Sequence, residues 1–226
     1  MSGKGVETRR RGAFWNATEI IQRVLVLHLL VLVVCAPTVI GLPFLPPDVS
    51  NIPLFALLLL PIGPAISAAV FAWQQLSLNR EKSVSHYFFR GYRLNWRDGL
   101  VMWGIGLVFL SILATNIAHA NAVAGGSFLL AVWLVLAALI SLLTLNALVI
   151  SALFSFRWRD VLRLSAFQLG SSWRTTLGFI AILIMVLGLM ILISEWLIFV
   201  IAGPVTWFIW MQARPMISKV DKNFTH

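Results

Sequence analysis

The sequence predicts an all-α membrane protein of about six transmembrane helices that contains a parallel internal repeat. Its 226 residues are 60% hydrophobic and only 11% charged, and the mean hydropathy is +0.91. Soluble domains are nearer a quarter charged. Several continuous apolar segments reach roughly 20 residues, which is the length that crosses the hydrocarbon core of a bilayer. A basic, aromatic segment between two of them returns in degenerate form between the next two.

Proline and glycine mark where the apolar segments end or break. The expected helices cover 19–40, 54–79, 98–118, 127–154, 174–193 and 196–213. Pro37 and Gly41 bend or end the first one. Intramembrane helix breaks are expected within the second and sixth helices, at Pro61, Gly63, Pro64, Gly203 and Pro204. Neighbouring helices or a cavity must then satisfy the freed backbone groups. Residues 194–213 also fit a re-entrant hairpin.

The distribution of basic residues predicts the topology. All 17 Lys and Arg residues lie before the first expected helix or near its start, between helices 2 and 3, between helices 4 and 5, or after helix 6. The three opposite loops have none. Because Lys and Arg accumulate in cytoplasmic loops, both termini are expected in the cytoplasm. Residues 1–18 and 214–226 are interpreted as cytoplasmic tails of a single transmembrane domain, 19–213.

The repeat is clearest at two Trp-Arg pairs. Trp96-Arg97 and Trp173-Arg174 lie 77 positions apart, and each closes a basic segment with the composition of an amphipathic helix. These water-side helices are expected near 83–95 and 159–172, with Ser83 as an N-cap. Because helices 2–3 and 4–5 enter the membrane in the same direction, the repeat is parallel, about an axis along the membrane normal.

Aromatic and basic side chains of these two segments form the candidate partner interface. Its expected members are Tyr87, Phe88, Arg90, Tyr92, Arg93, Trp96, Arg97, Trp158, Arg163, Trp173 and Arg174. Such helices bind either a protein partner or the headgroups of membrane lipids, and the sequence does not separate the two.

The sequence gives no pattern typical of an enzyme. The four histidines are dispersed, the single cysteine excludes a CxxC pair, and no catalytic, cofactor-binding or metal site is predicted. Within the spans, His28 is interpreted as a hydrogen-bonded histidine rather than a proton relay, and Asn146 as an interhelical hydrogen-bonding residue. The net charge of +9 is explained by residues that flank the helices, so no nucleic-acid partner is expected.

Several short motifs resemble the YesL-like family of small bacterial membrane proteins, over about residues 15 to 215. They are 37–41 (PTVIG), 63–65 (GPA), 85–97 (SHYFFRGYRLNWR) and the stretch 156–173. The segment between 41 and 63 departs from the compact form of the family. The resemblance implies a multi-pass protein of the bacterial cell membrane found alongside carbohydrate ABC importers. It implies no catalytic or ligand residues.

Three functions follow as hypotheses. The first is an auxiliary subunit of a carbohydrate (oligosaccharide) ABC import system that binds the permease subunits. The second is a stand-alone small transporter or channel, with broken helices 2 and 6 lining the path. The third is a membrane-bound regulator. The scarcity of ionisable groups in the middle of the spans favours the first over the second. Self-association into a homo-oligomer stays open.

Overall fold

The computed structural model describes residues 3–78, 81–122, 125–194 and 196–224, and the side chains of 18–222 within these ranges. Five of its helical segments are long and apolar enough to cross a membrane: Val49–Leu78, Val84–Ala118, Gly126–Leu153, Trp173–Leu192 and Leu197–Lys222. A sixth span is counted if Thr18–Val34 and Ala36–Phe44, bent by 64°, form one broken helix. The predicted class, an all-α multi-pass membrane protein, is confirmed.

The first helix bends where the sequence places a proline. Helix α1 (Gly3–Val34) ends just before Cys35, and α2 (Ala36–Gly41) continues with Pro37 in its first turn. Proline is tolerated there because the first amides of a helix have no partner within it. The expected N-terminal tail is helical from Gly3 onward. Met1 and Ser2 lie outside the described residues.

The predicted break at Pro61 is confirmed. After the short 3-10 helices η1 (Leu42–Phe44) and η2 (Val49–Asn51), α3 (Ile52–Leu59) stops before Pro61, and α4 (Ile62–Leu78) follows. Neighbouring helices satisfy two carbonyls at the break. The Thr38 hydroxyl donates to the Leu58 carbonyl at 2.5 Å, and the Trp103 indole donates to the Leu59 carbonyl at 2.8 Å. The expected breaks at Gly63 and Pro64 are absent, since both residues lie inside α4.

The first water-side helix is not a separate element. Helix α5 (Val84–Ala118) runs without interruption through both expected segments, 83–95 and 98–118. Its N-cap is Ser83, as predicted, and the Ser83 Oγ accepts from the backbone N–H of His86 at 3.3 Å. Asn95 does not end the helix, because its amide donates to the Ala152 carbonyl at 2.9 Å instead of competing for its own backbone.

The second copy of the repeat does break. After α6 (Gly126–Leu153), helix α7 (Trp158–Ser171) is capped by Ser172, and α8 (Trp173–Leu192) begins directly after this residue. Gly170-Ser171-Ser172 stands where the first copy has Arg93-Leu94-Asn95. Glycine and serine are weaker helix formers than arginine and leucine. The two copies therefore share sequence but adopt different local structures.

The last helix is longer than expected. Helix α9 (Leu197–Phe224) passes through Gly203 and Pro204 without the predicted break. It also passes through Pro215 and takes in most of the expected tail, 214–226, of which Thr225 and His226 lie outside the described residues. Apolar residues spaced for one helix face anchor this part in the core: Ala213, Met216, Ile217 and Val220.

Helix α4 is the centre of the fold. It packs against α5 most extensively and also against α6, α9 and α1. Small side chains permit this close approach, and five of them are fully buried: Ala65, Ser67, Ala68, Ala69 and Ala72.

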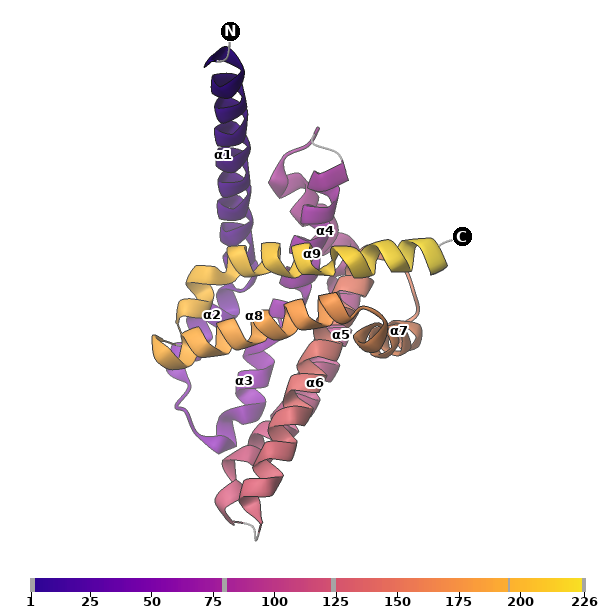
Figure 1. The fold of residues 1–226 in the computed structure, drawn as a ribbon. Coiled ribbons are helices and arrows are strands. Elements are labelled where there is room, and N and C mark those ends of the chain that lie inside the picture. Colours follow the sequence, from indigo (N-terminus) through magenta and orange to yellow (C-terminus); the bar gives the residue numbers. More distant parts are fainter. Residues whose placement is uncertain (1–2, 79–80, 123–124, 195, 225–226) are drawn as a thin grey trace.

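The connections between helices separate onto two sides of the molecule (Figure 1). The turns that join α2 to α3, α5 to α6 and α8 to α9, which lack Lys and Arg, lie toward the lower and left edges. The N-terminus, the end of α4 and the C-terminus lie toward the upper and right edges. The arrangement in space therefore agrees with the segregation of basic residues along the sequence.

Candidate functional site

The structure divides the predicted interface into a buried and an exposed set. Tyr87 is 3% exposed and Phe88 is 0% exposed, so both belong to the hydrophobic core and are out of reach of a partner. Tyr92 is half-buried and packs against the same core. The exposed members are Arg90, Arg93, Trp96, Arg97, Trp158, Arg163, Trp173 and Arg174. The aromatic pair at the start of α5 thus stabilises the fold, while later residues form the surface.

Three exposed tryptophans carry stacked arginines. The Arg97 guanidinium lies 5.2 Å from the centroid of the Trp96 ring, and Arg159 and Arg174 lie 5.0 and 5.5 Å from Trp158 and Trp173. A cation over an indole face is attracted by the ring quadrupole. Trp158 and Trp173 are 50% and 61% exposed, so each pair presents an aromatic edge and a positive charge together.

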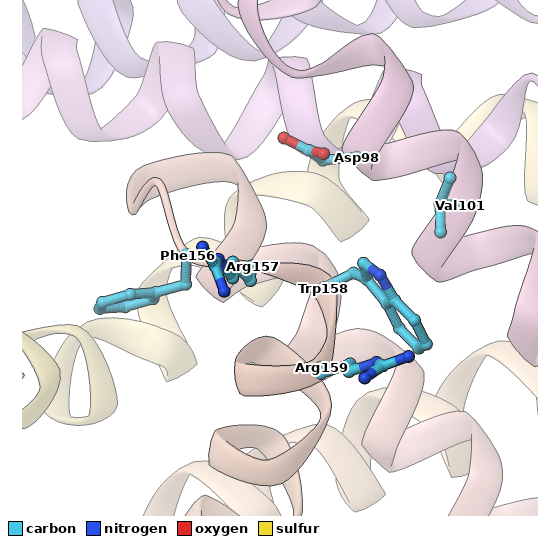
Figure 2. A pocket seen from close by; sticks show the side chains of 6 residues that line it. All are labelled: Asp98, Val101, Phe156, Arg157, Trp158 and Arg159. Carbon is cyan, nitrogen blue, oxygen red and sulfur yellow. The ribbon is translucent and has the colours of Figure 1, made fainter.

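A cavity of about 470 Å³ lies between α5 and the segment that joins α6 to α7, together with the first residues of α7. Asp98 and Val101 stand on α5 on one side, and Phe156, Arg157, Trp158 and Arg159 stand on the other (Figure 2). The bond from Asn95 to the Ala152 carbonyl ties α5 to the end of α6. It thereby places Asp98 beside the residues that follow α6.

A second cavity of about 520 Å³ shares Phe156 with the first. Its other lining residues belong to α7 and are Asp160, Arg163, Leu164 and Phe167. Both cavities thus combine one aspartate, at least one arginine and exposed apolar side chains. We call the two together the α5–α7 groove.

Opposite charges of the described residues line the same cavities of the α5–α7 groove without forming ion pairs. Within the described part of the chain, no ion pair within 4.0 Å joins Asp98 to Arg157 or Arg159, or Asp160 to Arg163. The carboxylates and guanidinium groups therefore keep free hydrogen-bonding capacity that a bound group of the opposite charge can use.

Polar contacts deeper in the bundle serve packing. The Gly203 N–H donates to Nδ1 of His28 at 3.2 Å, which makes His28 a hydrogen-bonded histidine, as predicted. The Trp73 indole donates to the Thr206 hydroxyl at 3.3 Å, and Trp210 donates to Gln74 at 2.9 Å. Since the first ring stacks on the second, these contacts tie α4 to α9.

Asn146 does not make the expected interhelical hydrogen bond. It is 1% exposed, and neither its amide nitrogen nor its carbonyl oxygen has a hydrogen-bond partner among the described residues. The part of α6 around it is buried on all sides, from Thr144 to Ala152. The Asn146 amide is therefore buried without compensation from the described residues for the loss of its hydrogen bonds to water, which has a free-energy cost.

The described residues hold no group of three or more His, Cys, Asp or Glu side chains that could bind a metal ion. No family model, curated protein or solved structure matches the chain at a significant level. The candidate site is accordingly defined by its own geometry.

The sequence reasoning missed Asp98, Phe156, Arg157 and Arg159 as site residues. A signal was present, since Asp98 and Arg157 are the charged residues that bound the apolar stretches of two consecutive helices on the same side. Consecutive antiparallel helices bring such residues to one level of the membrane.

Proposed function

We propose that the chain is an auxiliary membrane subunit that binds the permease subunits of a bacterial carbohydrate ABC importer. The proposal includes both termini in the cytoplasm, and the clustering of Lys and Arg at one end of the spans supports this orientation. The observation that supports a partner-binding role is the set of three exposed Trp-Arg pairs, two of which flank the α5–α7 groove or lie within it. The identity of the partner rests on the resemblance to the YesL-like family.

The chemistry of these pairs suits a protein contact. Tryptophan and arginine are enriched among the residues that dominate binding energy at interfaces. An arginine already stacked on an indole also has less rotational freedom to lose when a partner binds. Trp96, Trp158 and Trp173 each stand next to an arginine at the basic ends of the spans, so we propose a contact near the cytoplasmic face.

The alternative of a stand-alone transporter or channel has less support. A path along the expected breaks needs space at the glycines, yet these positions are closely packed. A Cβ at Gly63 would lie 2.3 Å from the Trp103 Cβ, and one at Gly203 would lie 2.5 Å from the His28 Cβ. These glycines allow helices to touch, which favours the partner-binding role.

The test is affinity purification of the full-length chain from its native membrane in mild detergent, with mass spectrometry of what accompanies it. The proposal expects permease subunits in near-equal amount, and their loss on Trp96→Ala combined with Trp173→Ala. The matched control is Trp196→Ala, because Trp196 is 43% exposed at the turn that joins α8 to α9, on the opposite side. Its variant should retain the partner.

Recovery of the chain alone, or only with copies of itself, would overturn the proposal. Substrate flux through liposomes that contain only this chain would then establish the transporter alternative. Altered expression of the importer with unchanged uptake kinetics would instead establish the regulator alternative.

A further inference from the structure

We propose that the α5–α7 groove binds the headgroup of a zwitterionic aminophospholipid, one that carries a phosphate and a primary ammonium, as phosphatidylethanolamine does. The site is the cavity between Asp98 and Val101 on α5 and residues Phe156 to Arg159 (Figure 2). The inference goes beyond the proposed function, because it concerns a lipid ligand and needs no permease.

The groove lies at the level of lipid headgroups. On α5, residues 99–118 contain no charged side chain, and Asp98 stands directly before them. On α6 and its continuation, residues 126–156 contain no charged side chain, and Arg157 stands directly after them. Because α5 and α6 are consecutive and antiparallel, both boundaries mark the same edge of the hydrocarbon core. Charged residues at that edge meet the polar headgroups.

The charges of the groove match a headgroup with both signs. Arg157 and Arg159 offer guanidinium donors, which suit a phosphate in geometry and charge. The Asp98 carboxylate only accepts hydrogen bonds, and a primary ammonium supplies three donors. Since Asp98 and these arginines form no ion pair with each other within the described chain, both partners are available to one ligand.

The remaining lining residues suit the rest of a phospholipid. Val101 and Phe156 give the cavity an apolar wall next to the spans, where the glycerol and acyl chains would begin. The Trp158 ring holds Arg159 by stacking, which fixes the cation at the edge of the cavity (Figure 2). Beyond Phe156, the second cavity repeats the combination with Asp160, Arg163 and Phe167.

The same chemistry predicts which lipids bind less well. Phosphatidylglycerol has a phosphate but no cation, so it leaves the Asp98 carboxylate beside an anion. Phosphatidylcholine has a quaternary ammonium without N–H groups, so it cannot donate to Asp98. A hydrogen bond to a charged group at a partly exposed site gives about a tenfold difference in affinity.

The experiment is native mass spectrometry of the full-length protein in detergent, titrated with these three lipids carrying identical acyl chains. Phosphatidylethanolamine should bind about tenfold more tightly than either of the others. Asp98→Asn should remove its advantage over phosphatidylglycerol, whereas Asp98→Glu should keep it. Arg157→Gln should weaken the binding of all three. Asp48→Asn, at the turn on the opposite side, is the matched control and should change nothing.

Two results would overturn the inference. Equal or tighter binding of phosphatidylglycerol, unaffected by Asp98→Asn in a protein whose melting temperature is unchanged, would show a basic surface without headgroup selectivity. Tight binding of soluble phosphoethanolamine to the protein in phosphatidylcholine nanodiscs, with no preference among the lipids, would assign the groove to a free small molecule instead.

Discussion

The indole N–H of Trp103 donates to the Leu59 carbonyl at 2.8 Å, where α3 gives way to α4. Pro61 interrupts the helix there, and a side chain of α5 replaces the hydrogen bond that regular helix would have supplied. The proline break and the tryptophan one helix away thus form a single structural unit.

Trp103→Phe should therefore destabilise the protein. The ring shape is largely kept, but the Leu59 carbonyl is left without its donor in an apolar setting, at a cost of about 1–2 kcal/mol. Unfolding in detergent measures the loss. Trp133→Phe, in a half-buried position of α6, is the control. Equal effects of the two substitutions would mean that the hydrogen bond contributes nothing particular.

Gly203→Ala should separate α1 from α9. An added methyl group would lie 2.5 Å from the His28 Cβ and 2.8 Å from the Val24 carbonyl oxygen, so the backbones must move apart. Overpacking of this kind costs about 1–3 kcal/mol. Gly188→Ala is the control in α8, where nothing lies within 4 Å, and it should gain about 0.5–1 kcal/mol. A neutral Gly203→Ala would contradict the close contact.

Replacement of Gly170-Ser171-Ser172 by Arg-Leu-Asn, the residues of the first copy, should join α7 and α8 into one helix. Spin labels at the exposed positions 166 and 184 report this by pulsed electron resonance. Eighteen residues of continuous helix place the two backbone positions about 27 Å apart. The native protein should give a shorter distance. Identical distances in both proteins would show that packing, not local propensity, sets the break at Ser172.

Asn146→Leu should stabilise the protein by about 1 kcal/mol, because it removes a buried polar group whose amide atoms have no partner among the described residues. Asn95→Leu should do the opposite, since the Asn95 amide donates to the Ala152 carbonyl. Thermal unfolding of both variants shows whether each substitution raises or lowers the stability of the protein. A destabilised Asn146→Leu would show that the amide has a favourable role in the native protein.

The turn before α3 should respond to acid. The Ser50 hydroxyl and backbone N–H both donate to the Asp48 carboxylate, which lowers the pKa of Asp48 below its ordinary 3.8. The stabilisation is present above the ordinary pKa and is lost as the pH falls through the lowered one. The Ser50 amide signal in an NMR titration should have its midpoint below 3.8. Ser50→Ala should move the Asp48 midpoint upward.

Sequence reasoning reached the class and most helix boundaries, because span length, basic flanks and proline positions are local signals. It failed where a helix end predicted from local residues is not an end in the folded protein. A Trp-Arg pair looks like a helix boundary in both copies, but it is one only in the second copy, where it follows Gly170-Ser171-Ser172. Residues 214–224 look like a polar tail by charge, yet their apolar residues recur at helical spacing and bury one face. Pro204 lies inside a helix that packs against α1.

Only part of the candidate site could be predicted from the sequence. The exposed Trp-Arg pairs follow from composition, since these residues favour the membrane boundary. Burial of Tyr87 and Phe88 did not follow, because which face of an aromatic helix meets the core depends on α4 and α6. The groove itself needs two segments about 60 residues apart, Asp98 and Arg157, to meet across a helical hairpin.

Because α5 is uninterrupted, the two copies of the repeat should transmit a displacement differently. A displacement applied near Arg90 is carried as a rigid rod through the membrane to the far turn, because no joint lies in between. A displacement applied to α7 reaches the break between α7 and α8 at Ser172. The backbone can bend there, so that α8 stays in place. The first copy of the repeat is therefore one continuous helix, whereas the second copy consists of two helices joined at Ser172.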